Sequence, residues 1–168
     1  YKSWLRSKQA NVNPHMTVLP APDYKEALEI YNEGWGFNFH LPHVELHVQS
    51  FNDYLIETSS VLFALDLDLN IVFEMGSEKL LNDLRTSNIC IGANLSEKAV
   101  GTNAAALSLI YENDINVIGS EHYIEAFQKY ACPACIYLSD RETAKGLLML
   151  VIPLDHFHPS QLIMLRNW

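Results

Sequence analysis

The stretch that decides the fold is Glu97-Lys-Ala-Val-Gly-Thr-Asn-Ala-Ala-Ala106, followed at residues 116–123 by Asn-Val-Ile-Gly-Ser-Glu-His-Tyr. Gly101, Thr102 and Asn103 come directly before an apolar run. A Thr or Asn side chain at a helix start accepts hydrogen bonds from the first free backbone N–H groups, and Gly allows a tight turn. The same N–H groups can instead hold an anionic or carbonyl ligand. The stretch therefore predicts a helix start that is either an ordinary cap or one wall of a binding site.

Length, charge and hydropathy limit the class of protein. The chain has 168 residues, of which 49% are apolar, and this is enough for the core of one compact domain. A net charge of −9 with only 11 Lys and Arg argues against direct binding to nucleic acid. The longest apolar run, residues 147–154, is too short to span a membrane. Three cysteines and no secretory signal indicate a reducing cytoplasm, and a first residue other than Met suggests part of a longer protein.

The spacing of apolar residues predicts helices and strands in a mixed order. Helical spacing or helix-start signals occur at residues 3–10, 24–31, 42–55, 79–84 after a Ser77 cap, 99–111, 121–129 and from 160 onward. Strand patterns occur at residues 61–66, 71–75, 116–119, 132–138 and 146–153, with turns at 67–70 and 139–145. Two hairpins flanked by helices predict an α+β fold, with a mostly antiparallel central sheet and helical N- and C-terminal extensions that pack together.

The cysteine pair Cys132 and Cys135 has the spacing of a redox dithiol. A redox pair normally lies at a helix start, whereas this pair lies in a predicted strand, where residues three apart point to opposite faces. Buried structural thiols are therefore the better interpretation, and a thiol-based redox switch or enzyme using both cysteines remains an alternative.

Histidines give a second alternative. His40, His43 and His47 share one face if the segment is helical, so a metal or gas sensor built on His side chains is possible chemistry. Pro42 disfavours a helical conformation of the residue before it, and a solvated helix face is the simpler interpretation. His122 follows Gly119 and Ser120, where a neutral imidazole can donate to a ligand or hold the loop in place.

The whole pattern resembles a known family. Gly-Thr-Asn at 101–103, Gly-x-Glu-His-Tyr at 119–123 and then Cys132 with an apolar strand are similar to the GAF sensor domains of bacterial sigma-54-dependent transcriptional activators. The regulators of acetoin and dihydroxyacetone metabolism are the group most like it. At the start of the chain, Ser3-Trp-Leu-Arg-Ser7 and Asn11-Val-Asn-Pro14 resemble the opening of those regulators. The resemblance extends in order from about residue 3 to residue 155.

The resemblance implies a GAF-like fold and a small-molecule-sensing regulatory domain. It implies an N-terminal helical extension and linker at 1–49, a sensor domain at 50–156 and the start of a connecting helix at 157–168. The chain is then not an enzyme and carries no cofactor. It lies in the cytoplasm without membrane contact and forms a homodimer. Sigma-54 RNA polymerase and DNA are contacted only through an ATPase and a DNA-binding module outside this chain.

The expected effector site lies between the sheet and the 97–127 segment. Polar contacts are expected from Thr102, Asn103 and His122, of which Asn103 offers both a donor and an acceptor and His122 a second donor. Apolar walls are expected from Phe63, Cys90, Phe127 and Cys132. By resemblance, Cys132 matches the family cysteine that faces the sensor pocket. No catalytic residue and no metal ligand is assigned.

Overall fold

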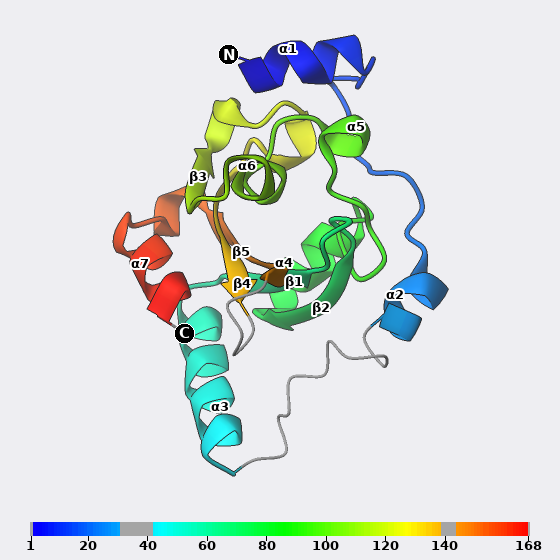
Figure 1. Cartoon of the computed structure of the whole chain (residues 1–168). Coiled ribbons are helices and arrows are strands. Elements are labelled where there is room, and N and C mark those ends of the chain that lie inside the picture. Colours follow the sequence, from blue (N-terminus) through cyan, green and yellow to red (C-terminus); the bar gives the residue numbers. More distant parts are fainter. Residues whose placement is uncertain (1, 31–41, 139–143, 168) are drawn as a thin grey trace.

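A five-stranded antiparallel sheet forms the centre of the computed structural model, which describes residues 2–30, 42–138 and 144–167 (Figure 1). The strand order is β2-β1-β5-β4-β3. The strands are β1 (Val61–Leu65), β2 (Ile71–Gly76), β3 (Ile115–Ile118), β4 (Tyr130–Leu138) and β5 (Ala144–Pro153). The β1–β2 and β4–β5 hairpins confirm the two predicted strand pairs. The predicted α+β fold with an antiparallel central sheet is confirmed as well.

Helices surround the sheet. In chain order they are α1 (Lys2–Gln9), α2 (Tyr24–Ile30), α3 (Pro42–Glu57), α4 (Glu78–Arg85), α5 (Glu97–Val100), α6 (Ala104–Tyr111) and α7 (Ser160–Asn167). None of these helices, in the ranges that the structure describes, is long and apolar enough to cross a membrane.

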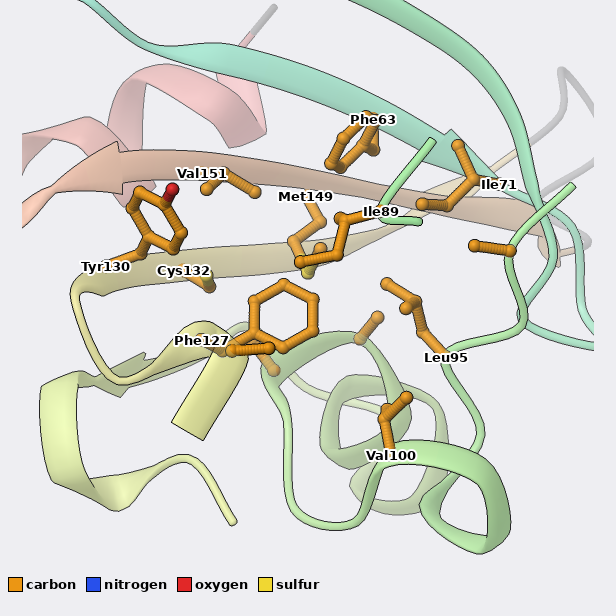
Figure 2. Packing of buried hydrophobic residues seen from close by; sticks show 14 of the residues in the cluster. Phe63, Ile71, Ile89, Leu95, Val100, Phe127, Tyr130, Cys132, Met149 and Val151 are labelled. Carbon is orange, nitrogen blue, oxygen red and sulfur yellow. The ribbon is translucent and has the colours of Figure 1, made fainter. Parts of the chain in front are cut away.

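Each face of the sheet carries its own apolar core, because alternate residues of a strand point to opposite faces. From β1, Phe63 belongs to the core under α4–α6, whereas Leu62 belongs to the core under α3 and α7. Figure 2 shows the first core, with Phe127 and Met149 among its central residues. We call the two sides the α6 face and the α3 face. The apolar stripe of α3 therefore has its partner surface within the chain, since Phe51 and Leu55 pack on the sheet.

The two terminal extensions pack in different places. Helices α3 and α7 share the α3 face, where Gln161 Nε2 donates to the Tyr54 hydroxyl at 3.4 Å. Helix α1 instead lies against α5 on the other side, and Figure 1 shows it far from the C-terminal end. The expected packing between terminal helices is therefore confirmed for α3 with α7 and is wrong for α1.

Two predicted helices have a different structure. The stretch 99–111 is divided into α5 and α6, because Gly101 has a φ of +71° and Asn103 starts a new helix. The stretch 121–129 forms short 3₁₀ turns at Gly119–Glu121 and Glu125–Phe127. Its backbone N–H groups bond to distant segments: Tyr123 donates to Thr102, Glu125 to Pro14 and Ala126 to Met16. These long-range bonds replace the i→i−4 bonds of an α-helix.

The cap of α4 and the start of β5 also differ slightly from the prediction. Ser77 precedes α4 as expected, but its backbone carbonyl, not its side chain, receives a bond, from the Leu81 N–H. Strand β5 begins two residues earlier than predicted, and most of the predicted 139–145 turn lies outside the described residues.

Candidate functional site

The junction of α5 and α6 is held by Asn103. Its Oδ1 accepts from the Ala106 N–H at 3.0 Å, and its Nδ2 donates to the carbonyls of Leu95 at 2.8 Å and Gly101 at 2.9 Å. The side chain is 2% exposed. Asn103 is therefore an N-cap that also fixes the preceding turn, and this structural role uses both of its amide hydrogens.

Gly101 is required by the packing of the 119–123 turn. An added Cβ would lie 2.6 Å from the Tyr123 Cβ, and the positive φ is a conformation that residues with a side chain rarely adopt. The Tyr123 N–H donates to the Thr102 carbonyl at 3.1 Å. The two sequence motifs therefore meet at one place, with Gly101 giving the space for Tyr123.

Helix α1 is fastened to this junction by a buried polar network. Arg6 forms two hydrogen bonds to the Glu97 carboxylate, at 2.6 and 2.9 Å, and the Ser3 hydroxyl donates to the same carboxylate. The Thr102 hydroxyl lies 2.7 Å from Ser3 Oγ and 3.4 Å from Ser7 Oγ. The hydrogen bond to Glu97 raises the pKa of Arg6, so this group stays cationic. The network joins the Ser-Trp-x-Arg-Ser motif to the Glu…Gly-Thr-Asn motif.

Trp4 links α1 to the second motif. Its indole N–H donates to the Glu121 carbonyl at 3.1 Å, and its ring meets the Tyr123 ring edge-on at 5.0 Å between centroids. Both contacts flank His122 in the sequence. Ser3, Trp4 and Arg6 were not predicted from the sequence to belong to the site. The one feature that could have indicated their role is that the Ser3–Ser7 motif and the Glu97 motif occur in the same chain.

His122 is the unusual group of the site. It is fully buried, its ring stacks on Phe127 at 5.6 Å, and its Nδ1 lies 3.1 Å from the Gly119 carbonyl. Burial lowers the pKa of the imidazole to about 4, so it is neutral at physiological pH. Nε2 has no hydrogen-bond partner among the described residues. An unpaired buried polar atom is rare and costs free energy, so Nε2 points to a partner beyond the described residues.

The predicted apolar walls are brought together in part. Phe63, Phe127 and Cys132 lie in the core of the α6 face, where Figure 2 shows them with other apolar side chains around them. Cys90 is buried too, but its sulfur lies 3.3 Å from the hydroxyl of Tyr24 on α2. Thr102 faces α1 and borders a hollow of about 360 Å³ that Lys2, Ser3, Trp4, Tyr111 and Glu121 also line.

The thiols do not have the features of a redox pair. Cys132 belongs to the core of the α6 face and Cys135 to that of the α3 face, as expected for a strand. All three cysteines are free and buried. Burial raises the pKa of Cys132, and burial with the nearby Asp114 raises that of Cys135 to about 12, so neither forms the reactive thiolate at neutral pH.

The alternative metal site rests on His40, His43 and His47. His40 and the side chains of His43 and His47 lie outside what the structure describes. Within the described residues, no group of three or more His, Cys, Asp or Glu side chains is arranged to hold a metal ion.

Comparison with solved structures defines the fold. The chain superposes with a TM-score of 0.82 and 18% identity on a chain of the Escherichia coli DhaR(N)–DhaL complex, covering 99% of this chain and 55% of that one. The shared fold is GAF-like. No family model matches the sequence.

The particular relatives are regulators of transcription. The chain is 26% identical over 161 residues to the acetoin dehydrogenase operon transcriptional activator AcoR of Bacillus subtilis, covering 96% of this chain and 26% of AcoR. It is 27% identical over 88 residues to a signal-transduction and transcriptional-control protein of Clostridium beijerinckii, of which it covers 14%. It thus spans 26% of the first protein and 14% of the second. Fold and similarity confirm the predicted resemblance and define a regulatory sensing domain.

Proposed function

We propose that this chain is the effector-sensing domain of a bacterial sigma-54-dependent transcriptional activator and has no catalytic activity of its own. The observation that carries the proposal is the similarity to a transcriptional activator over 96% of the chain. Residues 50–156 form the sensor, with 1–49 as an extension and linker and 157–168 as the start of a connecting helix. The ATPase and DNA-binding modules lie outside this chain and contact sigma-54 RNA polymerase and DNA. A net charge of −9 supports the absence of direct DNA binding here.

The proposed effector is a small molecule that binds between the sheet and the 97–127 segment. The unpaired Nε2 of His122, in contact with Phe127, supports this position, because a ligand can supply the partner that the described residues do not. Thr102 and Asn103 lie at the start of α6, and Phe63 and Cys132 belong to the apolar core beside it. Binding there requires the packed side chains to move apart, so the bound and free forms differ in structure.

The proposed signal passes from the effector to α1. Thr102 is hydrogen-bonded to Ser3 of α1, and Trp4 of α1 contacts both neighbours of His122. A shift of the α6 start or of the 119–123 turn therefore changes how well α1 docks. The effector then selects one of two α1 arrangements, which is a population shift with a coupling free energy between the two sites.

We also propose that the protein works in the cytoplasm as a homodimer. Ile163 on α7 is 65% exposed and Ile56 on α3 is 51% exposed, and they offer apolar area to a second copy. Sedimentation of the purified chain over a range of concentrations tests this. A strictly monomeric mass at high concentration contradicts the dimer.

The test of the sensing function is native mass spectrometry of the purified chain, followed by calorimetric titration of any molecule that is retained. His122→Phe keeps the ring volume but removes the unpaired nitrogen, and it is expected to weaken binding by about 1–3 kcal/mol. His156→Phe is the matched control, because His156 is exposed and its Nδ1 lies 3.0 Å from the Thr58 carbonyl, outside the site. Equal affinity of both variants rejects this effector position.

A second candidate input is a protein partner. The observation that favours it is a mostly apolar hollow of about 860 Å³ beside α1, bordered by Trp4, Leu5 and Tyr123, with Trp4 41% and Leu5 43% exposed. DhaR(N), which shares the fold, was crystallised with the protein DhaL. Leu5→Asp would abolish capture of a protein partner and leave the binding of a small effector near His122 unchanged.

A further inference from the structure

The tautomer of His122 is fixed by its backbone contact. A carbonyl oxygen only accepts hydrogen bonds, so Nδ1, which lies 3.1 Å from the Gly119 carbonyl, carries the proton and donates. The imidazole is neutral because it is buried. A neutral ring has one proton, and Nε2 is therefore a bare lone pair. In this tautomer the free nitrogen of His122 accepts from a ligand, whereas the sequence led us to expect a donor at this position.

The direction of the Thr102 hydrogen bond is fixed in the same way, by the partners of its neighbours. The one hydroxyl hydrogen of Ser3 goes to the Glu97 carboxylate, so at 2.7 Å the Thr102 hydroxyl must donate to Ser3 Oγ. The hydroxyl hydrogen of Ser7 is likewise used, on the Ser3 carbonyl at 3.0 Å. Each hydroxyl therefore donates to the next group: Thr102 donates to Ser3, and Ser3 donates to the Glu97 carboxylate. Thr102 keeps only lone pairs for any further contact.

Asn103, like His122 and Thr102, donates its hydrogens within the protein. Both of its amide hydrogens are donated, to the carbonyls of Leu95 and Gly101, and its oxygen accepts one bond from the Ala106 N–H. The oxygen has a second lone pair. All three polar side chains that the sequence assigned to the site thus donate their hydrogens to other groups of the protein, and toward a ligand they can only accept.

We propose that the effector must bring a hydrogen-bond donor to His122 Nε2, and that it is an uncharged hydroxyl-bearing small molecule with an apolar part against Phe127. This inference rests on the proposed effector position. A carboxylate or a ketone oxygen would place lone pair against lone pair at Nε2. A hydroxyl group avoids this, and its own oxygen can still accept from a backbone N–H at the start of α6.

The charges around the site support an uncharged ligand. The buried side chains of the described residues include no Lys and no Arg, so an anion would lose its hydration without gaining a cation. Arg6 is already paired with Glu97. A bare Nε2 can also coordinate a metal ion. Among the described residues, however, no group of three or more His, Cys, Asp or Glu side chains could hold one.

The first measurement is independent of any effector. Histidine labelled with ¹⁵N in the purified chain reports, through long-range ¹⁵N–¹H correlation, which ring nitrogen of His122 carries the proton. The expected result is a protonated Nδ1 and a bare Nε2 at neutral pH. A proton on Nε2 overturns the inference but leaves the sensing function standing, whereas a failure to find any effector removes the proposed function without changing the tautomer.

The second measurement uses probes that differ in hydrogen-bond chemistry: 1,2-propanediol, its dimethyl ether and lactate. The diol is expected to shift the Nε2 resonance and raise the melting temperature, while the ether, which has no donor, and lactate, which is charged, do neither. An equal response to the ether or to lactate overturns the inference. No response to the diol, at any concentration that leaves the chain folded, overturns it as well and indicates that only a buried water meets Nε2.

Two variants separate the hydrogen bond from the shape of the site. His122→Phe removes the acceptor and is expected to weaken diol binding about tenfold, the effect of one lost hydrogen bond. His122→Gln keeps a carbonyl acceptor on a shorter side chain and is expected to recover part of that loss. Melting curves and amide NMR spectra establish that both variants fold. Equal weakening by Phe and Gln contradicts the acceptor role.

Discussion

The two faces of the sheet differ in the kind of side chain they bury. On the α3 face, Phe51, Leu55, Leu148 and Leu165 pack as an ordinary apolar core. On the α6 face, a similar core continues into a region with buried Thr102, Asn103 and His122. Buried polar groups cost free energy unless they are paired. Among these three side chains only His122 Nε2 has no hydrogen-bond partner in the described residues, and Asn116 Oδ1 on β3 has none either. The α3 face is therefore built for stability, whereas the α6 face also carries one side-chain atom, His122 Nε2, that stability alone does not require.

The largest effect is expected from Gly101→Ala on the α6 face. The new Cβ would lie 2.6 Å from Tyr123 at a backbone conformation that favours Gly. Strain and steric overlap together should lower the free energy of unfolding by about 3–5 kcal/mol. Gly119→Ala is the control, since its φ is also positive, at +54°, but the nearest atom is 3.5 Å away. It should lose only about 1 kcal/mol in urea unfolding. Similar losses for both would mean that Tyr123 moves aside easily.

Leu55→Ala tests the α3 face. The side chain is fully buried on the sheet, so the cavity should lower the free energy of unfolding by about 2–5 kcal/mol. Because Leu55 lies on the opposite face from His122, the affinity of the folded protein for the effector should stay the same. Calorimetric titration well below the melting temperature measures this. A changed affinity would show that the two faces are coupled and would weaken the comparison.

A pH titration isolates His122. Burial lowers its folded pKa to about 4 from 6.5, so below pH 6.5 the unfolded chain binds a proton that the folded chain does not. The free energy of unfolding is therefore not reduced by this group above pH 6.5, and it falls as the pH falls toward 4. The loss amounts to about 3 kcal/mol.

His122→Phe should remove this part of the pH dependence and leave stability at pH 7 nearly unchanged, because the loss of the Nδ1 bond to the Gly119 carbonyl is offset by removal of the unpaired Nε2. Urea unfolding from pH 4 to pH 8 measures the difference between the two chains, with His156→Phe as the control. Parallel curves for the original chain and His122→Phe would mean that His122 is accessible to protons in the folded state.

The smallest effect is expected from Glu97→Gln, which keeps the shape of the side chain and removes its charge. The ion pair with Arg6 is partly exposed on the Arg side, at 38%, so the loss of stability should be about 1 kcal/mol. The larger consequence should be local: α1 loosens, and its amide hydrogens exchange faster than those of α6. Hydrogen exchange followed by mass spectrometry checks this. Unchanged exchange in α1 would show that Trp4 and Tyr123 hold the helix without Glu97.

Much of the fold follows from local patterns. The runs that became β1, β2, β4 and β5 are apolar and bounded by turn residues, and the structure confirms both hairpins. The Gly-Thr-Asn stretch correctly marks a helix start, with Asn103 as its cap. The 121–129 stretch was wrongly predicted as a helix, because its backbone hydrogen bonds go to Pro14 and Met16, which are far away in the sequence.

In the candidate site, too, some features follow from the local sequence and others depend on contacts between distant residues. The sequence by itself determined which residues are chemically capable of a role, among them Thr102, Asn103 and His122, because side-chain type and spacing are local properties. Only the tertiary structure decided where their hydrogens go: Ser3 and Glu97 lie 94 residues apart and direct the Thr102 hydroxyl, and the Gly119 carbonyl sets the His122 tautomer. Donor or acceptor character depends on these partners, and burial, which keeps His122 neutral, is a property of the folded chain alone.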